Sequence, residues 1–445
     1  MTARKRWDGR RLHFVGAGGC GMSGLALAAH ALGASVTGSD RSDGPFLPRL
    51  RDRGISVTLG HSVDALPDGA EVVVSSAIPF DNPERAGASE RGLREIGRGQ
   101  LLAELVQMRR CVAVAGSHGK TTTAAMIVHA LSGAGRSVDF VIGGDLLATG
   151  INADWRDRAW CVVETDESDR SLLELAPEIA VLTNVEHEHV ETFPAVSDVE
   201  EVFRAFLGQS EHAVVWDRPQ VRALRDGPVS TFDAPGALLM PQGSQFSWRG
   251  RTVRLRVPGA HNALNAAAAL EACVSAGADP DASAAALADF PGVARRFEHI
   301  GHTASGAEIY DDYAHHPSEV MAALAAARTL EPDRLVAVLR PWGLARTQAM
   351  AHAYGVALAS ADLVVVLDVA SEGKQPGSSS GAGPRLIVDA AIAAAPLRPT
   401  RWISGLDAVE RFLHEELDPE AMCVTLGCGD VAQRLLYSPI STPAH

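Results

Sequence analysis

The sequence predicts an α/β protein with mainly parallel sheets, and two observations support this fold class. Strand-like and helix-like stretches alternate along almost the whole chain, as they do in βαβ units. Two glycine-rich turns, in residues 16–24 and 116–119, each join a strand-like stretch to a helix-like one. The length of 445 residues accommodates about three domains of ~150 residues each.

The first part of the chain shows the pattern twice. A strand is expected at residues 12–15, before the first glycine-rich turn, and a helix at 25–32 after it. A second strand, 35–40, ends on Asp40. A further strand at 71–75 and a connecting helix at 92–105 precede the second turn, which joins a strand at 111–115 to a helix at 122–131.

The remainder of the chain continues the alternation, with one antiparallel interruption. Apolar residues alternate within 244–257, which predicts a small hairpin, and an alanine-rich helix is expected at 265–276. The glycine- and serine-rich stretch 371–384 is expected to form a flexible loop. The other strands are expected at 160–164, 179–183, 213–216, 334–339, 363–367 and 423–426.

Composition restricts the partners. A net charge of −14 disfavours general attraction to nucleic acid or to a membrane surface. Arginine supplies nearly all the positive charge, since the only lysines are Lys5, Lys120 and Lys374. The six cysteines include no C-x-x-C pair, which indicates buried free thiols in a reducing compartment. Neither a bilayer-spanning apolar run nor a signal-peptide pattern is present, so we expect a cytoplasmic protein. We expect it to be a monomer or a homodimer.

The second turn, Gly116-Ser-His-Gly119-Lys120-Thr121, has the layout of a phosphate-binding loop. Backbone N–H groups and the positive end of the following helix would face an anion, while Lys120 would reach terminal phosphates. The Thr121 hydroxyl can ligate Mg²⁺. The alternative is an ordinary glycine-containing turn, although the glycines, lysine, threonine and flanking elements all agree with phosphate binding.

The first turn fits the pattern G-x-G-x-x-G, and Asp40 follows at the end of the next strand. On this motif alone a nicotinamide-dependent dehydrogenase is a fair hypothesis. The same turn can hold any diphosphate, including that of a nucleotide sugar. A dehydrogenase would also not need a second phosphate-binding loop.

Acids and histidines follow two strands after the phosphate-binding loop. Glu164 and the acids of 166–169 come at the carboxyl end of a strand, where Mg²⁺ ligands belong. The run Glu186-His-Glu-His189 follows the next strand. Zinc binding or plain loop residues are the alternatives. Because neighbouring side chains on an extended segment point to opposite faces, we favour a magnesium or phosphate role for one histidine.

Three further polar clusters are open to more than one interpretation. Asn262 and Asn265 could cap the alanine-rich helix or hydrogen-bond a base. The run 295–298, Arg-Arg-Phe-Glu, is either a solvated hinge or a source of guanidinium for a phosphate. The polar residues of 311–317 lie at a strand-to-helix junction and are hard to explain as core.

Together these blocks resemble the Mur ligase family, and within it the branch that adds L-alanine to UDP-N-acetylmuramate. The resemblance extends from about Arg11 to Leu436 and depends on the order and spacing of the blocks. The matching stretches are 16–24, 75–78, 81–84, 116–123, 143–144, 150–153, 164–169, 183–186, 261–265, 292–298 and 311–317.

The resemblance implies three domains, which we place at 1–98, 99–297 and 298–445. The first, Rossmann-like, would bind the UDP sugar, and the central one, built like a P-loop ATPase, would bind ATP. The third, Rossmann-like again, would bind the amino acid. The implied reaction of peptidoglycan precursor synthesis converts the substrate carboxylate into an acyl phosphate with ATP, and the amine then displaces phosphate. The implied cofactors are ATP and Mg²⁺, and the implied partners are the UDP-sugar acid and the amino acid.

The resemblance also implies roles for individual residues. The ATP-binding residues would be Gly116, Ser117, His118, Gly119, Lys120, Thr121, Thr122, Asn262, Asn265 and Arg296. The UDP-sugar-binding residues would be Gly18, Gly19, Gly21, Met22, Ser23, Asp40, Ser75, Ser76 and Ala77. The implied metal ligands are Thr121, Glu164 and His189. The implied amino-acid-binding residues are Tyr313, His315 and Arg346, and the implied catalytic residues are Lys120, His189, His315 and Arg346.

The sequence departs from the family pattern in three places: the segment 341–347, the loop 371–384, which lacks the family's usual composition, and Gly259-Ala260, where Gly-Arg is typical. The family's Pro-His-Arg-Tyr-Thr-Arg-Thr corresponds to 341–347, where Trp342 and Gly343 replace the histidine and the first arginine, and Arg346 remains. Loss of a buried bidentate arginine costs on the order of 2–3 kcal/mol. Two alternatives therefore stay open: a divergent member that joins another amine or another nucleotide-linked acid, and a non-catalytic UDP-sugar-binding protein.

Overall fold

The computed structural model describes residues 6–189, 192–241, 243–370, 382–429 and 431, which form two compact units. The first unit consists of Met1–His187, Ala195–Asp233 and Leu264–Phe290, and the second of Glu188–Pro194, Ala234–Ala263 and Pro291–His445. Among the described residues there are four sheets, two in each unit. The mixed α/β architecture with mostly parallel sheets is the predicted fold class.

The N-terminal sheet is fully parallel, with the strand order β3-β2-β1-β4-β5. Its strands are β1 (Arg11–Val15), β2 (Ser35–Asp40), β3 (Ser56–Leu59), β4 (Glu71–Val74) and β5 (Glu95–Gly97). Its helices are α1 (Cys20–Ala31), α2 (Leu47–Asp52), α3 (Pro83–Glu90) and α4 (Arg98–Val106). The helix expected at 92–105 is wrong at its beginning, because the short strand β5, which buries Ile96, occupies that position.

The central sheet has the order β12-β11-β10-β6-β9-β7-β8 and is parallel except for β8, which runs antiparallel to β7. Its strands are β6 (Arg110–Ala115), β7 (Asp139–Leu146), β8 (Ile151–Asp154), β9 (Trp160–Glu164), β10 (Ile179–Leu182), β11 (His212–Trp216) and β12 (Val229–Phe232). The helices of this region are α5 (Lys120–Gly133), α6 (Val196–Gly208), α7 (Pro219–Arg222), α8 (Ala260–Ser275) and α9 (Pro280–Leu287). Strand β6 lies in the middle of the sheet and is almost entirely buried valine, alanine and cysteine, as expected for a strand covered on both faces.

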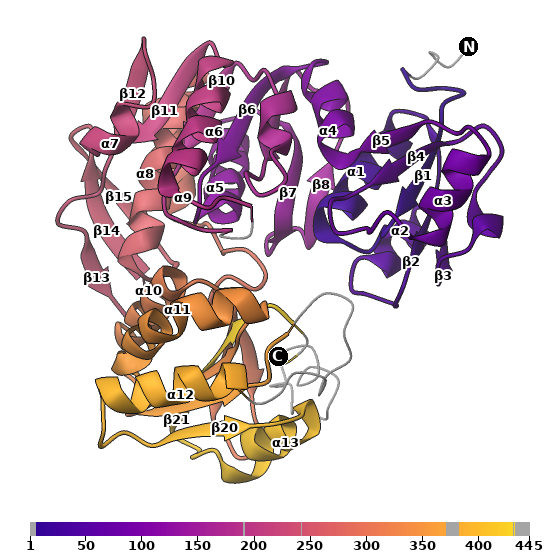
Figure 1. Ribbon diagram of the computed structural model, residues 1–445. Coiled ribbons are helices and arrows are strands. Elements are labelled where there is room, and N and C mark those ends of the chain that lie inside the picture. Colours follow the sequence, from indigo (N-terminus) through magenta and orange to yellow (C-terminus); the bar gives the residue numbers. More distant parts are fainter. Residues whose placement is uncertain (1–5, 190–191, 242, 371–381, 430, 432–445) are drawn as a thin grey trace. The chain divides into compact units, whose positions relative to one another are not determined.

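Helix α1 connects the N-terminal sheet to the central sheet, since it packs on β7 and β8 (Figure 1). A Cβ atom added at Gly24 would lie 3.0 Å from Val141 Cγ1, so the helix approaches β7 closely. From α2, Arg49 donates hydrogen bonds of 2.9 Å to Asp145 Oδ1 and to Asn152 Oδ1. These apolar and ionic contacts explain why the two sheets form one compact unit.

The second unit contains a small antiparallel sheet and the C-terminal sheet. The small sheet consists of β13 (Leu238–Met240), β14 (Gly243–Trp248) and β15 (Arg251–Leu255), which confirms the predicted hairpin. The C-terminal sheet has the order β16-β17-β21-β18-β19-β20, with only the edge strand β16 antiparallel. Its strands are β16 (Glu298–His302), β17 (Glu308–Asp312), β18 (Arg334–Arg340), β19 (Leu363–Leu367), β20 (Thr400–Ile403) and β21 (Ala421–Gly427).

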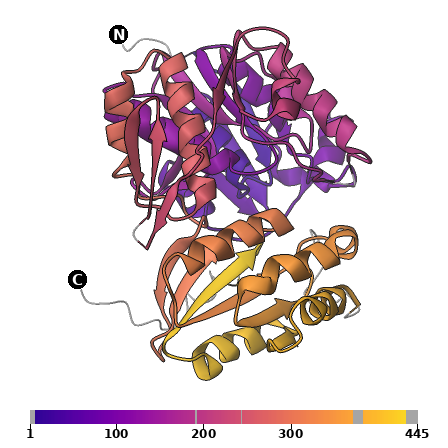
Figure 2. The same cartoon turned by 90° about the vertical axis from the view of Figure 1, so that its left-hand side faces the viewer.

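Helices cover both faces of the C-terminal sheet (Figure 2). Helices α10 (Pro317–Arg328), α11 (Leu344–Ala357) and α12 (Ala382–Ala394) pack on one face, and α13 (Leu406–Arg411) packs on the other. Of the loop expected at 371–384, residues 371–381 lie outside the described residues. Residues 382–384 already belong to α12, so the end of that expectation is wrong.

Two sequence expectations concern the whole chain. All six cysteines are free thiols, five of them buried, as expected. Within the described ranges, no helix combines the length and the apolar character that crossing a bilayer would require.

Candidate active site

The phosphate-binding loop connects β6 to α5 and depends on two glycines. Gly116 and Gly119 have φ angles of 132° and 78°, and Gly119 directly precedes the helix. A Cβ atom would lie 2.1 Å from Thr183 Oγ1 at Gly116 and 2.4 Å from Asn265 Oδ1 at Gly119. Only glycine fits this backbone, and since the N–H groups of Ser117 and His118 donate to Asn184, it is the N-terminus of α5 that would face an anion.

Lys120 extends its ammonium group back over the same loop. Its Nζ donates to Glu167 Oε2 at 3.1 Å and to the carbonyl oxygen of Ser117 at 3.2 Å. The Lys120 side chain is 14% exposed and that of Glu167 is 1% exposed. A positive charge held beside backbone donors in a partly buried site fits the terminal phosphates of a nucleotide.

Thr121, at the start of α5, and Glu164, at the end of β9, place two possible oxygen ligands for a metal side by side. Thr121 Oγ1 donates to Glu164 Oε1 at 2.9 Å, and the backbone N–H of Gly143 donates to Glu164 Oε2 at 2.6 Å. A hydroxyl and a carboxylate are hard ligands of the kind Mg²⁺ prefers. The residues present therefore fit a magnesium ion next to the loop.

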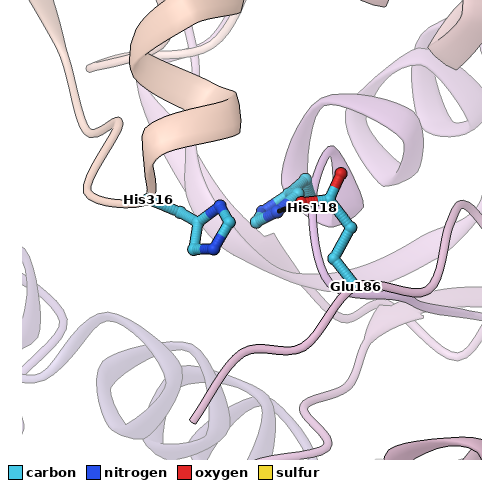
Figure 3. A group of neighbouring side chains, drawn as sticks. All are labelled: His118, Glu186 and His316. Atoms are coloured by element: carbon cyan, nitrogen blue, oxygen red, sulfur yellow. Dashed lines mark hydrogen bonds and ion pairs between the residues drawn. The ribbon is translucent and has the colours of Figure 1, made fainter. Parts of the chain in front are cut away.

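The loop is anchored by the segment that follows β10. The backbone N–H of Glu186 donates to Ser117 Oγ at 2.9 Å, and that of His118 donates to Asn184 Oδ1 at 2.9 Å. The His118 ring lies beside the Glu186 carboxylate, with 3.3 Å between Nε2 and Oε2 (Figure 3). His316, also drawn in Figure 3, belongs to the second unit, where its Nδ1 accepts a hydrogen bond from the backbone N–H of Ser318 at 3.3 Å.

Of the other residues expected to bind ATP, Thr122 and Asn265 lie at the phosphate-binding loop, whereas Asn262 lies at the turn before α8. Thr122 is buried in the first turn of α5. Asn265, on α8, has its side-chain oxygen over Gly119 and so borders the phosphate-binding loop. Asn262 Nδ2 donates to the carbonyl oxygen of Pro258 at 2.7 Å, so this amide holds the turn before α8.

The first glycine-rich turn lies at the carboxyl ends of β1 and β2. The backbone N–H of Gly18 donates to Asp40 Oδ2 at 2.8 Å, which places the expected acid against the turn. Gly19 precedes α1, whose first turn contains Gly21, Met22 and Ser23. Ser75, Ser76 and Ala77 follow β4, and the last two are exposed.

A buried network under this turn was not singled out from the sequence. Glu84 is fully buried and accepts hydrogen bonds from Ser39 Oγ at 2.6 Å and from the backbone N–H of Ser62 at 3.1 Å. Its Oε2 also lies 3.3 Å from His13 Nε2. Burial acts to raise the pKa of Glu84, but the contacts with His13, Ser39 and Ser62 outweigh it and hold that pKa below its ordinary value.

In the second unit, the expected residues His189, His315 and Arg346 converge on Glu188. Glu188 Oε1 lies 3.2 Å from His315 Nε2 and 3.5 Å from Arg346 Nη1, and Arg346 Nη2 is 3.3 Å from His189 Nδ1. Glu188 is 3% exposed. Burial alone would lower the pKa of His315, but Glu319 and Glu188 outweigh it and raise that pKa.

Glu188 was missed as a site residue because the run 186–189 was expected to be extended. Extended backbone would direct Glu188 and His189 to opposite faces. His189 instead has a φ angle of 53°, so the expectation is wrong there, and its Nε2 lies 3.9 Å from Glu188 Oε1. The available signal was a carboxylate between two histidines.

Arg296, which precedes β16, lies beside Tyr313, which follows β17. The guanidinium carbon of Arg296 lies 5.3 Å from the Tyr313 ring centroid, and the rings of Tyr313 and His315 meet edge to face at 5.5 Å. The neighbouring Asp312 is almost fully buried, and this burial raises its pKa to about 7.

The segment that departs from the family pattern leads into α11. Gly343 directly precedes this helix with a φ angle of 75°, and its N–H donates to the carbonyl oxygen of Ala370 at 2.8 Å. Trp342 and Ala370 form an isolated parallel bridge. Arg346, one turn later, is 5% exposed. The loss of the arginine thus comes with a left-handed backbone that favours glycine.

Three models of one family match almost the whole chain. Residues 11–110 match the Mur ligase family catalytic domain, 114–273 the Mur ligase middle domain, and 295–429 the Mur ligase glutamate ligase domain. Two relatives are named UDP-N-acetylmuramate–L-alanine ligase. One, from Mycobacterium sp. (strain JLS), is 39% identical over 95% of this chain and 93% of its own length. The other, from Rubrobacter xylanophilus, is 37% identical over 95% of this chain and 98% of its own length.

Two solved structures have a similar fold. The UDP-N-acetylmuramate-alanine ligase of Thermotoga maritima superposes with a TM-score of 0.83 at 26% identity, covering 96% of this chain and 98% of its own. A murein peptide ligase from Psychrobacter arcticus superposes with a TM-score of 0.74 at 24% identity, covering 98% of this chain and 100% of its own, and supports the fold alone.

Proposed function

Because this chain belongs to the Mur ligase family, we propose that it joins the carboxylate of UDP-N-acetylmuramate to the amino group of L-alanine, converting ATP to ADP and phosphate in peptidoglycan precursor synthesis. The observation that carries this proposal is the similarity, at 39% and 37% identity over 95% of this chain, to two relatives that bear that ligase's name. The arrangement of Lys120, Thr121 and Glu164 around the loop supports it independently.

The chemistry requires help because a carboxylate is a poor electrophile and repels a phosphate. Transfer of the γ-phosphoryl group to a carboxylate oxygen gives an acyl phosphate. The amine then forms the C–N bond and loses a proton, and the bond to phosphate breaks. Mg²⁺, which Thr121 and Glu164 would hold and for which His189 stays a predicted ligand, would supply positive charge where the anions meet. The Lys120 ammonium and the N-terminus of α5 stabilise the same developing charge.

We assign the amino acid to the residues around Glu188. In this proposal Glu188 orients His315 and Arg346 through the contacts described above. Arg346 attracts the carboxylate of the incoming amino acid, and Tyr313 and His315 face it. A raised pKa keeps more of His315 protonated near neutral pH, which favours an anionic ligand.

We assign the diphosphate of the UDP sugar to the first glycine-rich turn, with Asp40, Ser75, Ser76 and Ala77 beside it. We place the reaction in the cytoplasm and the enzyme as a monomer or homodimer. The three domains are proposed at 1–98, 99–297 and 298–445, so that the UDP sugar, ATP and the amino acid each have one.

One assay tests the reaction. The purified protein is incubated with Mg-ATP, UDP-N-acetylmuramate and each amino acid in turn, and both phosphate release and product mass are measured. We expect alanine-dependent turnover with one phosphate released per amide formed. Turnover only with another amine, which the Trp342 and Gly343 departures would favour, or only with another acid would contradict the assignment. UDP-sugar binding with no turnover for any pair would indicate a non-catalytic binding protein.

A further inference from the structure

The edge strand of the C-terminal sheet contains two histidines that the proposed reaction does not use. His299 and His302 both lie on β16, three positions apart, and side chains at that spacing on a regular strand point to opposite faces. The pairing of β16 with β17 shifts between His299 and Gly301, so Ile300 is an extra residue in a bulge. Gly301 has a φ angle of 130°, which such a bulge accommodates.

The bulge brings both histidines to one face, beside a carboxylate. In the register of the two strands, His299 lies opposite Tyr310 and His302 lies opposite Glu308. Tyr310 and Glu308 are two positions apart on β17 and therefore share a face. The two imidazole rings meet edge to face with centroids 5.3 Å apart, and His302 Nε2 lies 3.7 Å from Glu308 Oε1.

We propose that His299, His302 and Glu308 form a binding site for a zinc-class divalent transition metal, with water completing the coordination. One nitrogen from each histidine and one carboxylate oxygen lie within 4.8 Å of one another. Ligand atoms around a tetrahedral zinc ion, at about 2.0–2.1 Å from the metal, are separated by roughly 3.3 Å. Small side-chain rotations therefore close the site around an ion.

The chemistry of the donors selects the class of metal. Two imidazoles among three protein ligands favour zinc, nickel and copper, whereas magnesium and calcium sites are built mainly of oxygen ligands. The side chains of His302 and Glu308 are 38% and 43% exposed, and His299 is exposed as well, so a metal can enter from solvent. The His299 ring also contacts Tyr310, with centroids 5.0 Å apart, and this packing limits the orientations that the ligand can take.

Zinc and copper titrations of the full chain test the site. The protein is first treated with a chelator, and Zn²⁺ alone is then added in a calorimeter. We expect the unmodified protein to bind one more zinc ion than the H299A/H302A double variant, and the E308Q variant to bind that ion at least tenfold more weakly. With Cu²⁺, electron paramagnetic resonance should show coupling to two nitrogens in the unmodified protein and lose it in the double variant.

A histidine elsewhere in the same unit provides the matched control. His352 is exposed on α11, and H352A should bind zinc as the unmodified protein does. Single variants H299Q and H302Q, each checked for an unchanged melting temperature in chelator, replace the double variant if it does not fold. Equal zinc stoichiometry and affinity with and without the two histidines would overturn the proposal, as would an equal loss of binding in H352A.

Discussion

Replacing Lys120 with methionine should nearly abolish ATP-dependent phosphate release and leave UDP-sugar binding intact. Methionine keeps most of the aliphatic part of the lysine side chain and removes the ammonium charge that lies next to the loop. The aliphatic part remains packed, since the side chain is only 14% exposed. Sugar binding is assigned to the first glycine-rich turn. This turn follows β1 of the N-terminal sheet, whereas Lys120 follows β6 of the central sheet.

The size of the loss follows from the reach of the ammonium group. Lys120 Nζ lies 3.1 Å from Glu167 Oε2, so it can approach an anionic oxygen to about that distance. At this separation and an effective dielectric constant of about 20, two unit charges interact by roughly 5 kcal/mol. Part of that energy is offset when phosphate displaces Glu167. We therefore expect a net loss of about 3–4 kcal/mol, or about 10²–10³-fold in kcat/KM for ATP.

Steady-state phosphate release measures the loss, and calorimetry with UDP-N-acetylmuramate measures sugar binding. Lys374→Met is the matched control, since that lysine belongs to no proposed site, and it should keep full activity. ATP should also protect Lys120 from an amine-reactive label that mass spectrometry can locate among three lysines. A variant that retains more than a tenth of the activity, or that loses sugar binding to the same extent, would refute the reasoning.

Three further substitutions test other parts of the structure. Gly119→Ala should weaken ATP binding at least tenfold in calorimetry, because its Cβ would lie 2.4 Å from Asn265 Oδ1 on a backbone with a φ angle of 78°. Unchanged ATP binding would contradict the role of this loop in binding phosphate. Glu84 has a lowered pKa, so its stabilisation is present above the unfolded pKa and is lost as pH falls through the folded value. In urea titrations from pH 7 to pH 3, Glu84→Gln should show a smaller acid-dependent loss of unfolding free energy than the unmodified protein, and parallel curves would exclude this role. Asp312 has a pKa raised to about 7, so its contribution is present below the unfolded pKa of about 3.9 and is lost as pH rises through 7. Asp312→Asn should therefore gain stability relative to the unmodified protein as pH rises from about 4 to about 7 in thermal melts, with no further change above about pH 8, and a constant difference between pH 4 and pH 7 would contradict the assignment.

Local patterns predicted the two glycine-rich turns and about half of the strands, but they did not indicate β3, β7, β8, β12 or β20. The strands expected at 160–164 and 363–367 coincide with β9 and β19, since both are apolar runs in sheet interiors. The phosphate-binding loop was predictable because its backbone admits few residues, and Gly116 and Gly119 mark the positions where a side chain would collide. Strand β5 was not predictable, because its three residues are too few to show a period of two.

The contacts within the site were less accessible to sequence reasoning. His189 lies beside Glu188 because the chain turns at His189, where the φ angle is 53°, and the sequence of that run did not predict this turn. The pairing of His299 with His302 has the same origin, because a strand without a bulge would separate them. In both places a single irregular residue decides which side chains meet.

The contact of α1 with β7 and β8 determines where the chain can be divided into fragments that fold. A fragment ending at residue 98 would keep α1 but lose the surface on which the helix packs. It would also leave Arg49 without the acceptors that Asp145 and Asn152 provide. Such a fragment should aggregate rather than act as an independent sugar binder. Exchange of the sugar-recognition module between relatives should succeed only when the hairpin from residue 139 to residue 154 is transplanted with it.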